Sequence, residues 1–134
     1  MSLVKTDALQ GKTTAKTVTV TVGATATQAL EAGLCKAWIH FDGTSGTPIT
    51  RDSINMSAIS DLGTGDYRVN FVANFDNGYY ASSGTGANTQ YFFAVDQAVD
   101  PTTSNFTMRF TYAPSTTSDN DIDNVSTIHI GELA

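Results

Sequence analysis

Apolar and polar residues alternate along most of this chain, and this pattern predicts β-strands. In "KTVTVTV" the valines occupy every second position and threonines stand between them. In "KAWIHF" Trp38 shares one face with Lys36 and His40, opposite an apolar face. A period of two residues places one face of a strand in a core and leaves the other open. The amphipathic indole of Trp38 on the open face is expected to need partial cover.

The same alternation continues toward the C-terminus. Strands are expected near residues 53–59 and 66–73, and again in "SNFTMRFTY" and "VSTIHIGEL". Between the first two, "SDLGTGD" supplies Gly63 and Gly65. Glycine adopts positive φ without strain, so these residues predict a hairpin turn.

Three segments lack the strand pattern. The stretch "ATATQALEAG" is compatible with a short helical turn that ends at its glycine, and the Gly-rich residues 82–88 are expected to form a long loop. Residues 1–14 contain few apolar side chains, namely Leu3, Val4 and Leu9. Such a segment has little to pack in a core, so it is expected to be an extended arm, or a strand that pairs with something else.

About eight short strands at regular spacing, with turn residues between them, predict an all-β fold. We expect an antiparallel β-sandwich or jelly roll with a short extended N-terminal arm. Residues 1–30 are assigned to an attachment or oligomerisation arm with the first strand, and residues 31–134 to the β-sandwich domain. The 134 residues are enough for one independent core.

The composition of the chain argues against two classes of partner, nucleic acids and membranes. Charged residues make up 15% of the chain and the net charge is −6, with the basic residues scattered singly. Binding to phosphate backbones needs clustered Lys and Arg, so nucleic acid is not an expected partner. No apolar run approaches the roughly 20 residues that span a bilayer, and the N-terminus lacks a signal peptide pattern. Synthesis and folding in the cytosol, without membrane insertion, are therefore expected.

The loop "DNDIDN" is the best metal candidate. Asp119, Asp121 and Asp123 have the every-other-residue spacing of calcium-binding loops. Ile130 stands where such a loop would place its closing glutamate. A calcium site and a plain acidic loop are therefore both open, and no other cofactor is expected.

Catalytic chemistry is not indicated. The only histidines, His40 and His129, each lie inside an alternating strand, which favours structural imidazoles. A zinc site would need at least two further ligands, and the acidic residues lie almost wholly in turns, where nothing pairs them. We therefore expect a protein that is not an enzyme.

Aromatic residues flank the Gly-rich segment and offer a candidate binding surface. Alternate members must point into the core. The others, with neighbouring amides, could stack on sugars or protein partners. The candidate residues are Tyr79, Tyr80, Asn88, Gln90 and Tyr91.

Three segments together resemble a known family. They are "KAWIHFDGT", "TRDSINMSAISDLGTGDYRVNF" and the closing "VSTIHIGE". These are similar to the β-rich domain near the C-termini of many bacteriophage tail-fibre and virion structural proteins. The shared elements are the Ala-Trp-x-x-Phe-x-Gly-Thr run, the Arg-x-Ser-x-Asn segment and the "GTGDYxVxF" hairpin strand.

The resemblance implies a virion component, usually homotrimeric, that displays a β-sandwich outward. Its partners would be copies of itself, other virion proteins and a host-surface glycan or protein. Leu3, Val4, Leu9 and Trp38 are the expected subunit contacts. Two alternatives stay open, a capsid decoration (cement) protein that stabilises the phage head and a free carbohydrate-binding module.

Overall fold

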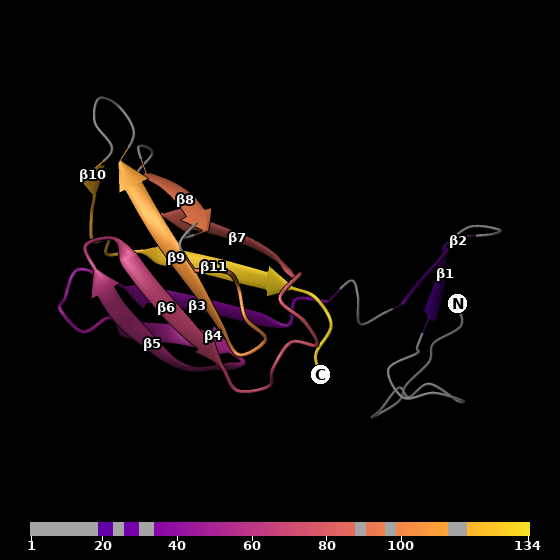
Figure 1. Cartoon of the computed structure of the whole chain (residues 1–134). Helices are drawn as coiled ribbons and strands as arrows, with labels where there is room; N and C mark the ends of the chain where they lie inside the picture. Colours follow the sequence, from indigo (N-terminus) through magenta and orange to yellow (C-terminus); the bar gives the residue numbers. More distant parts are fainter. Residues whose placement is uncertain (1–18, 23–25, 30–33, 88–90, 96–98, 113–117) are drawn as a thin grey trace. The chain divides into compact units, whose positions relative to one another are not determined.

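The computed structural model describes residues 19–22, 26–29, 34–87, 91–95, 99–112 and 118–134 (Figure 1). Every regular element in these ranges is a β-strand. No helix among them is long and apolar enough to cross a bilayer. The chain divides into two compact units, residues 1–34 and 35–134.

The first unit contains one antiparallel pair. Strand β1 (Thr19–Val22) pairs with β2 (Ala26–Ala29), so that Thr21 lies opposite Thr27. The expected helical turn is therefore wrong over residues 26–29. β-Branched threonine favours extended backbone, and here a valine- and threonine-rich partner strand is available to pair with it. The expected arm, with Leu3, Val4 and Leu9, lies outside the described residues.

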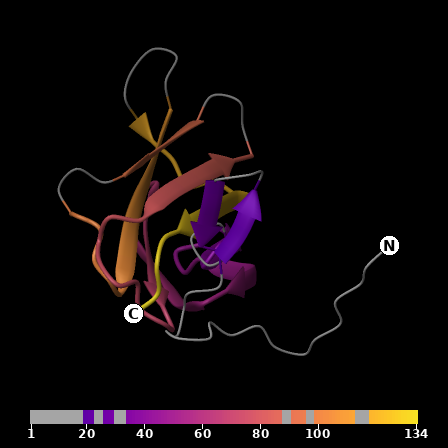
Figure 2. The same cartoon turned by 90° about the vertical axis from the view of Figure 1, so that its right-hand side faces the viewer.

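The second unit is a sandwich of two antiparallel sheets, which confirms the predicted fold class (Figures 1 and 2). One sheet has four strands in the order β4-β3-β11-β7, and the other has five, in the order β10-β9-β6-β5 with β8 paired to β9. Their bounds are β3 (Ala37–Asp42), β4 (Ile49–Ile54), β5 (Met56–Gly63), β6 (Asp66–Phe71), β7 (Ala81–Gly86), β8 (Tyr91–Val95), β9 (Asn105–Tyr112), β10 (Ser118–Asp119) and β11 (Val125–Ile130).

The core lies between the sheets and follows the alternation in the sequence. In β3, β6 and β9 the inward side chains are buried and their neighbours turn outward. Each fully buried large apolar side chain contributes roughly 1.5–3 kcal/mol relative to an exposed one. The main core residues are Ala37, Ile39, Phe41, Tyr67, Val69, Phe71, Phe106, Met108, Phe110 and Val125.

One expected strand, over residues 53–59, is divided at Asn55. β4 ends just before this residue in one sheet and β5 begins just after it in the other. Asn55 has a φ of 56°, a left-handed conformation that asparagine tolerates better than most residues. Its side-chain amide accepts from the Ala73 N–H at 2.6 Å and donates to the Ala73 carbonyl at 3.0 Å. These two bonds fix the corner where the chain changes sheets.

The Gly-rich loop expected over residues 82–88 is also wrong, because residues 81–86 form β7 and pair with β11. Its glycines serve close packing instead of a turn. A Cβ on Gly84 would lie 2.5 Å from Phe93 Cδ2, and one on Gly86 would lie 2.9 Å from Ile122 Cδ1. Side chains at these inward positions would collide with the core, so only glycine lets this strand lie so close.

Candidate functional site

The outer face of the four-stranded sheet carries an apolar row. Ala37 and Ile39 point into the core, so Trp38 between them points outward. Strand register places Ile54 of β4 on one side of Trp38 and Ile128 of β11 on the other. Trp38 is half-buried, whereas the isoleucines are 52% and 45% exposed. Three large apolar side chains thus cross the sheet in adjacent strands.

Beyond this row the same face becomes polar around Arg51. Its guanidinium lies 3.1 Å from Asp42 Oδ2, donates to Asn124 Oδ1 and lies 3.3 Å from His40 Nε2. The hydroxyl and N–H of Thr44 donate to Asp42 and, with Arg51, lower the pKa of that carboxyl. The charges at this end of the face are therefore paired locally, and His40 is one member of the network.

The neighbouring tyrosines Tyr79 and Tyr80 have opposite surroundings. Tyr79 is 96% exposed. The Tyr80 ring stacks on Phe75 with centroids 4.2 Å apart, and its hydroxyl lies 3.0 Å from the Asn105 carbonyl oxygen. Burial raises the pKa of Tyr80. Tyr80 is partly buried, with its ring packed against the core and its hydroxyl bonded to backbone. It therefore differs from Tyr79, and its assignment to a binding surface stays a prediction.

Within the residues that the structure describes, none of the other aromatic and amide candidates is shown beside Tyr79. Asn88 and Gln90 lie outside those residues, and Tyr91 is described only as the first residue of β8. Tyr79 instead borders a hollow of about 460 Å³ with Gly78, Asp100 and Pro101. Tyr79 is thus a surface residue, and a binding surface that also includes Asn88, Gln90 and Tyr91 stays a prediction.

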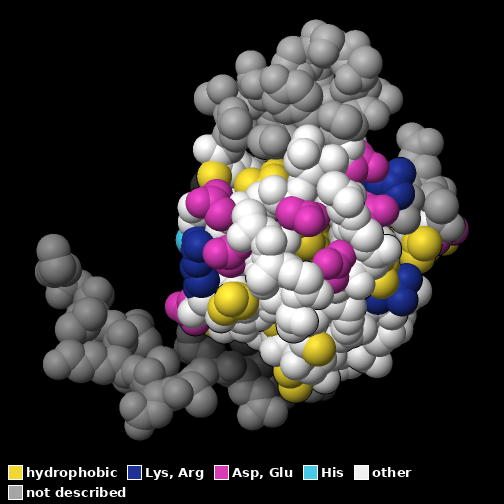
Figure 3. Space-filling view, turned by 90° about the vertical axis from the view of Figure 1, so that its left-hand side faces the viewer, with side chains coloured by type: hydrophobic (Ala, Val, Ile, Leu, Met, Phe, Trp, Pro, Cys, Tyr) yellow, Lys and Arg dark blue, Asp and Glu magenta, His cyan; other side chains and the backbone are white. Residues whose placement is uncertain are grey.

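The three aspartates of the calcium candidate have different partners. Asp119 accepts from Thr111 Oγ1 at 3.0 Å. Asp121 Oδ1 accepts from the Gly65 N–H at 2.8 Å and from the Tyr67 hydroxyl at 3.0 Å, while Asp123 is exposed. The described part of the chain holds no group of three or more His, Cys, Asp or Glu that could bind a metal ion. Figure 3 shows acidic side chains spread over this end of the sandwich.

The geometry therefore corrects the calcium interpretation. The spacing of the aspartates suggested that three carboxylates surround one ion, but the backbone directs Asp119 toward β9 and Asp121 toward the β5–β6 turn. The carbonyl of Ile122, between Asp121 and Asp123, accepts from the Gly43 N–H at 2.8 Å, and the Ile122 side chain is buried. This loop ties the two sheets together.

Replacing Asp121 with alanine should lower the free energy of unfolding by about 2 kcal/mol, because the buried Gly65 N–H loses its acceptor and the Tyr67 hydroxyl keeps only its bond to the Gly43 carbonyl. Asp123→Ala is the matched control, and we expect a change within about 0.5 kcal/mol at this exposed position. Urea unfolding measures both variants. Calcium or a chelator should leave the melting temperature of the unaltered chain unchanged. A rise with calcium that Asp121→Ala abolishes would restore the metal interpretation.

His129 belongs to the core. Its ring is fully buried, with Nδ1 2.8 Å from Ser82 Oγ and Nε2 3.3 Å from Thr127 Oγ1. It also meets the Phe106 ring edge-on, at a centroid distance of 4.9 Å. Burial lowers the pKa of His129 to about 4, so the imidazole is neutral near pH 7. Its contacts are those of a packed structural side chain.

Sequence reasoning selected Trp38 but missed the side chains beside it. Ile54 and Ile128 are far from Trp38 in the chain, and only the strand order β4-β3-β11 makes them neighbours. The sequence did contain a signal for this row, since β4 and β11 each carry an isoleucine on the outward face. No protein-family model, curated protein or solved structure matches this chain.

Proposed function

We propose that this chain is a structural protein of a bacteriophage virion, a tail-fibre or appendage component whose β-sandwich contacts the host surface. The observation that carries the proposal is the apolar row of Ile54, Trp38 and Ile128. It lies on a sheet whose other face is fixed by the core, so its shape is rigid. Exposed apolar groups gathered on a firm surface mark interaction sites. The motifs shared with tail-fibre domains point to the same role.

The two parts of the chain would have different roles, host contact for the sandwich and attachment for the N-terminal segment. The sandwich has its own core and begins next to Leu34, where the two units meet in the sequence. Residues 1–30, with Leu3, Val4 and Leu9, would attach the protein to other virion proteins and assemble it as a homotrimer. The proposed role involves no catalysis. His129 and Tyr80 pack in or against the core, and Asp121 holds a turn.

Gold labelling of purified particles tests this function. A peptide tag would follow Ala134, which is exposed, and electron microscopy would locate antibody-bound gold. We expect label on tail appendages. Label on the head would instead support the decoration protein, with the apolar row covered by a capsid subunit. Particles without label would overturn the virion role, and light scattering that reports a monomer at high concentration would overturn the homotrimer.

A further inference from the structure

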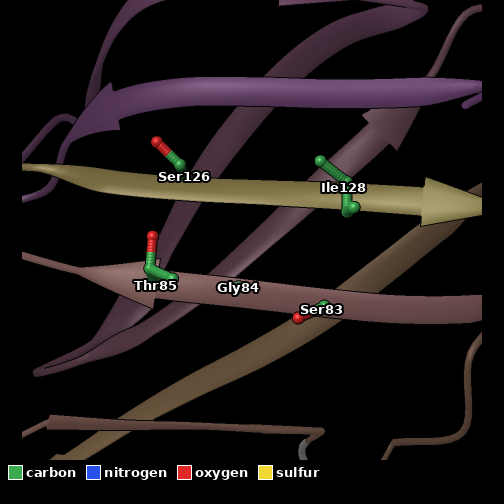
Figure 4. A pocket seen from close by; sticks show the side chains of 5 residues that line it. All are labelled: Ser83, Gly84, Thr85, Ser126 and Ile128. Atoms are coloured by element: carbon green, nitrogen blue, oxygen red, sulfur yellow. The ribbon is translucent and has the colours of Figure 1, made fainter.

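A small hollow lies beside the apolar row, between β11 and β7. Its volume is about 150 Å³, and Figure 4 shows Ser126 and Thr85 side by side on adjacent strands at one end, with Ile128 and Ser83 at the other. Gly84 lies between them in β7. Ile128 is also the register neighbour of Trp38, so the hollow and the indole belong to one continuous surface.

We propose that this hollow, together with Trp38, binds one neutral sugar ring of a glycan. The hollow is open to solvent, and its volume of about 150 Å³ is similar to that of a cavity that holds one six-membered ring. Three lining residues carry hydroxyls, and each hydroxyl can both donate and accept, as sugar hydroxyls require. Ile128 and the indole supply apolar surface for the C–H face of the ring. The site thus combines a few polar groups with apolar walls, as small-molecule sites do.

Charge selects a neutral ligand over an ionic one. None of the five lining residues is charged, and neither are Trp38 and Ile54 in the adjoining row. The guanidinium of Arg51 on the same face is engaged by Asp42 and Asn124. Lys36, two residues before Trp38 on the same face, does not line the hollow. A phosphorylated ligand or a cationic peptide would therefore lose hydration inside the hollow without gaining a counter-charge there.

The size of the apolar surface argues against a second copy of the chain as the occupant. A stable protein–protein interface buries about 800 Å² on each partner. Here the apolar part is a single row of three side chains, two of which are only about half exposed. It is flanked by serine and threonine on one side, whereas interface cores are enriched in aromatic and apolar groups. A sugar ring needs only the row and the hollow.

This inference rests on the proposed function, since it names the class of host-surface ligand. Trp38 is the only tryptophan of the chain, so its fluorescence reports directly on the site. The full chain would be titrated with soluble oligosaccharides of glucose, galactose and N-acetylglucosamine, and with heparin as a charged comparison. We expect a saturable change in emission with at least one neutral sugar and none with heparin. No saturable change with any neutral sugar would overturn the proposal.

Two variants locate the binding. Ser83→Phe should fill the hollow and abolish the response, whereas Ser60→Phe, at an exposed position of β5 in the other sheet, should leave it intact. Thr85→Val changes only a hydroxyl and should weaken binding roughly threefold to tenfold. Unchanged affinity in both Ser83→Phe and Thr85→Val would place the sugar elsewhere and overturn the site. Trp38 emission that depends on protein concentration without sugar would make this face a self-interface instead.

The two proposals fail separately. Gold-labelled appendages without any response to neutral sugars would leave the virion role and remove the glycan site. The opposite outcome is a sugar response of the purified chain that Ser83→Phe abolishes, together with particles that carry no gold label. That outcome would remove the virion role and establish a free carbohydrate-binding module.

Discussion

Replacing Gly65 with alanine should lower the free energy of unfolding by about 3 kcal/mol. Gly65 ends the turn between β5 and β6 with a φ of 72°, where an L-residue costs about 1–2 kcal/mol. An added Cβ would also lie 2.7 Å from the Phe110 carbonyl oxygen and 2.9 Å from the Asn120 nitrogen. Both atoms are backbone, so the neighbouring strand itself would have to move. That movement would disturb the bond from the Gly65 N–H to Asp121.

Gly46→Ala is the matched control, because a Cβ there meets no atom within 4 Å. Its change should stay within about 0.5 kcal/mol. Urea denaturation of both variants gives the two free energies, and equal slopes would show that the denatured states are comparable. A loss below about 1 kcal/mol in Gly65→Ala would mean that the turn relaxes without strain. The loop over residues 120–124 would then not be the element that holds this turn.

Much of the sandwich could be predicted because alternation is a local signal. The inward and outward faces of β3, β6 and β9 follow directly from apolar residues at every second position. The positive φ of Gly63 and Gly65 was likewise readable from the turn sequence and is confirmed. In these segments the local preference and the packing agree, so the sequence alone is sufficient.

Two segments of the sandwich were predicted wrongly because distant contacts decide their conformation. "SSGTG" has the composition of a loop, yet it forms a strand because it pairs with β11. Its glycines leave room for Phe93 and Ile122, which occupy the space where side chains would be. Asn55 divides a continuous polar–apolar pattern because Ala73 satisfies its amide. Neither partner is adjacent in the sequence, so no local pattern could reveal them.

The candidate site was predictable only in part, for the same reason. The open face of Trp38 could be assigned, since its neighbours in β3 are apolar. That one of Tyr79 and Tyr80 must be buried was also expected, but the pattern does not say which. Assembling the row and the hollow required the order of four strands, which depends on the whole fold.

Acid should destabilise this protein through His129. The unfolded chain protonates this imidazole near its ordinary pKa of 6.5, whereas burial lowers the folded pKa to about 4. Between these values the unfolded state binds more protons, so the free energy of unfolding falls as the pH is lowered through this window. Below about pH 4 both states are protonated and the loss is complete. The shift corresponds to about 3 kcal/mol.

His129→Gln should lose this part of the pH dependence, because glutamine does not titrate. Its stability at pH 7 will also be lower, so the comparison is between slopes of unfolding free energy against pH. His40→Gln, at a half-exposed position, is the matched control for the loss of one imidazole. The carboxylates are common to all three proteins, and their acid titration therefore cancels.

An NMR titration of the imidazole gives the same answer without a substitution. The His129 ring resonances should report the neutral form until the protein approaches pH 4. Protonation earlier would require water or a carboxylate at a ring that is packed against Phe71, Tyr80 and Phe106 and bonded to two hydroxyls. A ring that titrates near its ordinary pKa, or equal slopes for His129→Gln and the unaltered chain, would show that this end of the core opens to solvent. The layered packing between β11 and β9 would then be looser than its contacts imply.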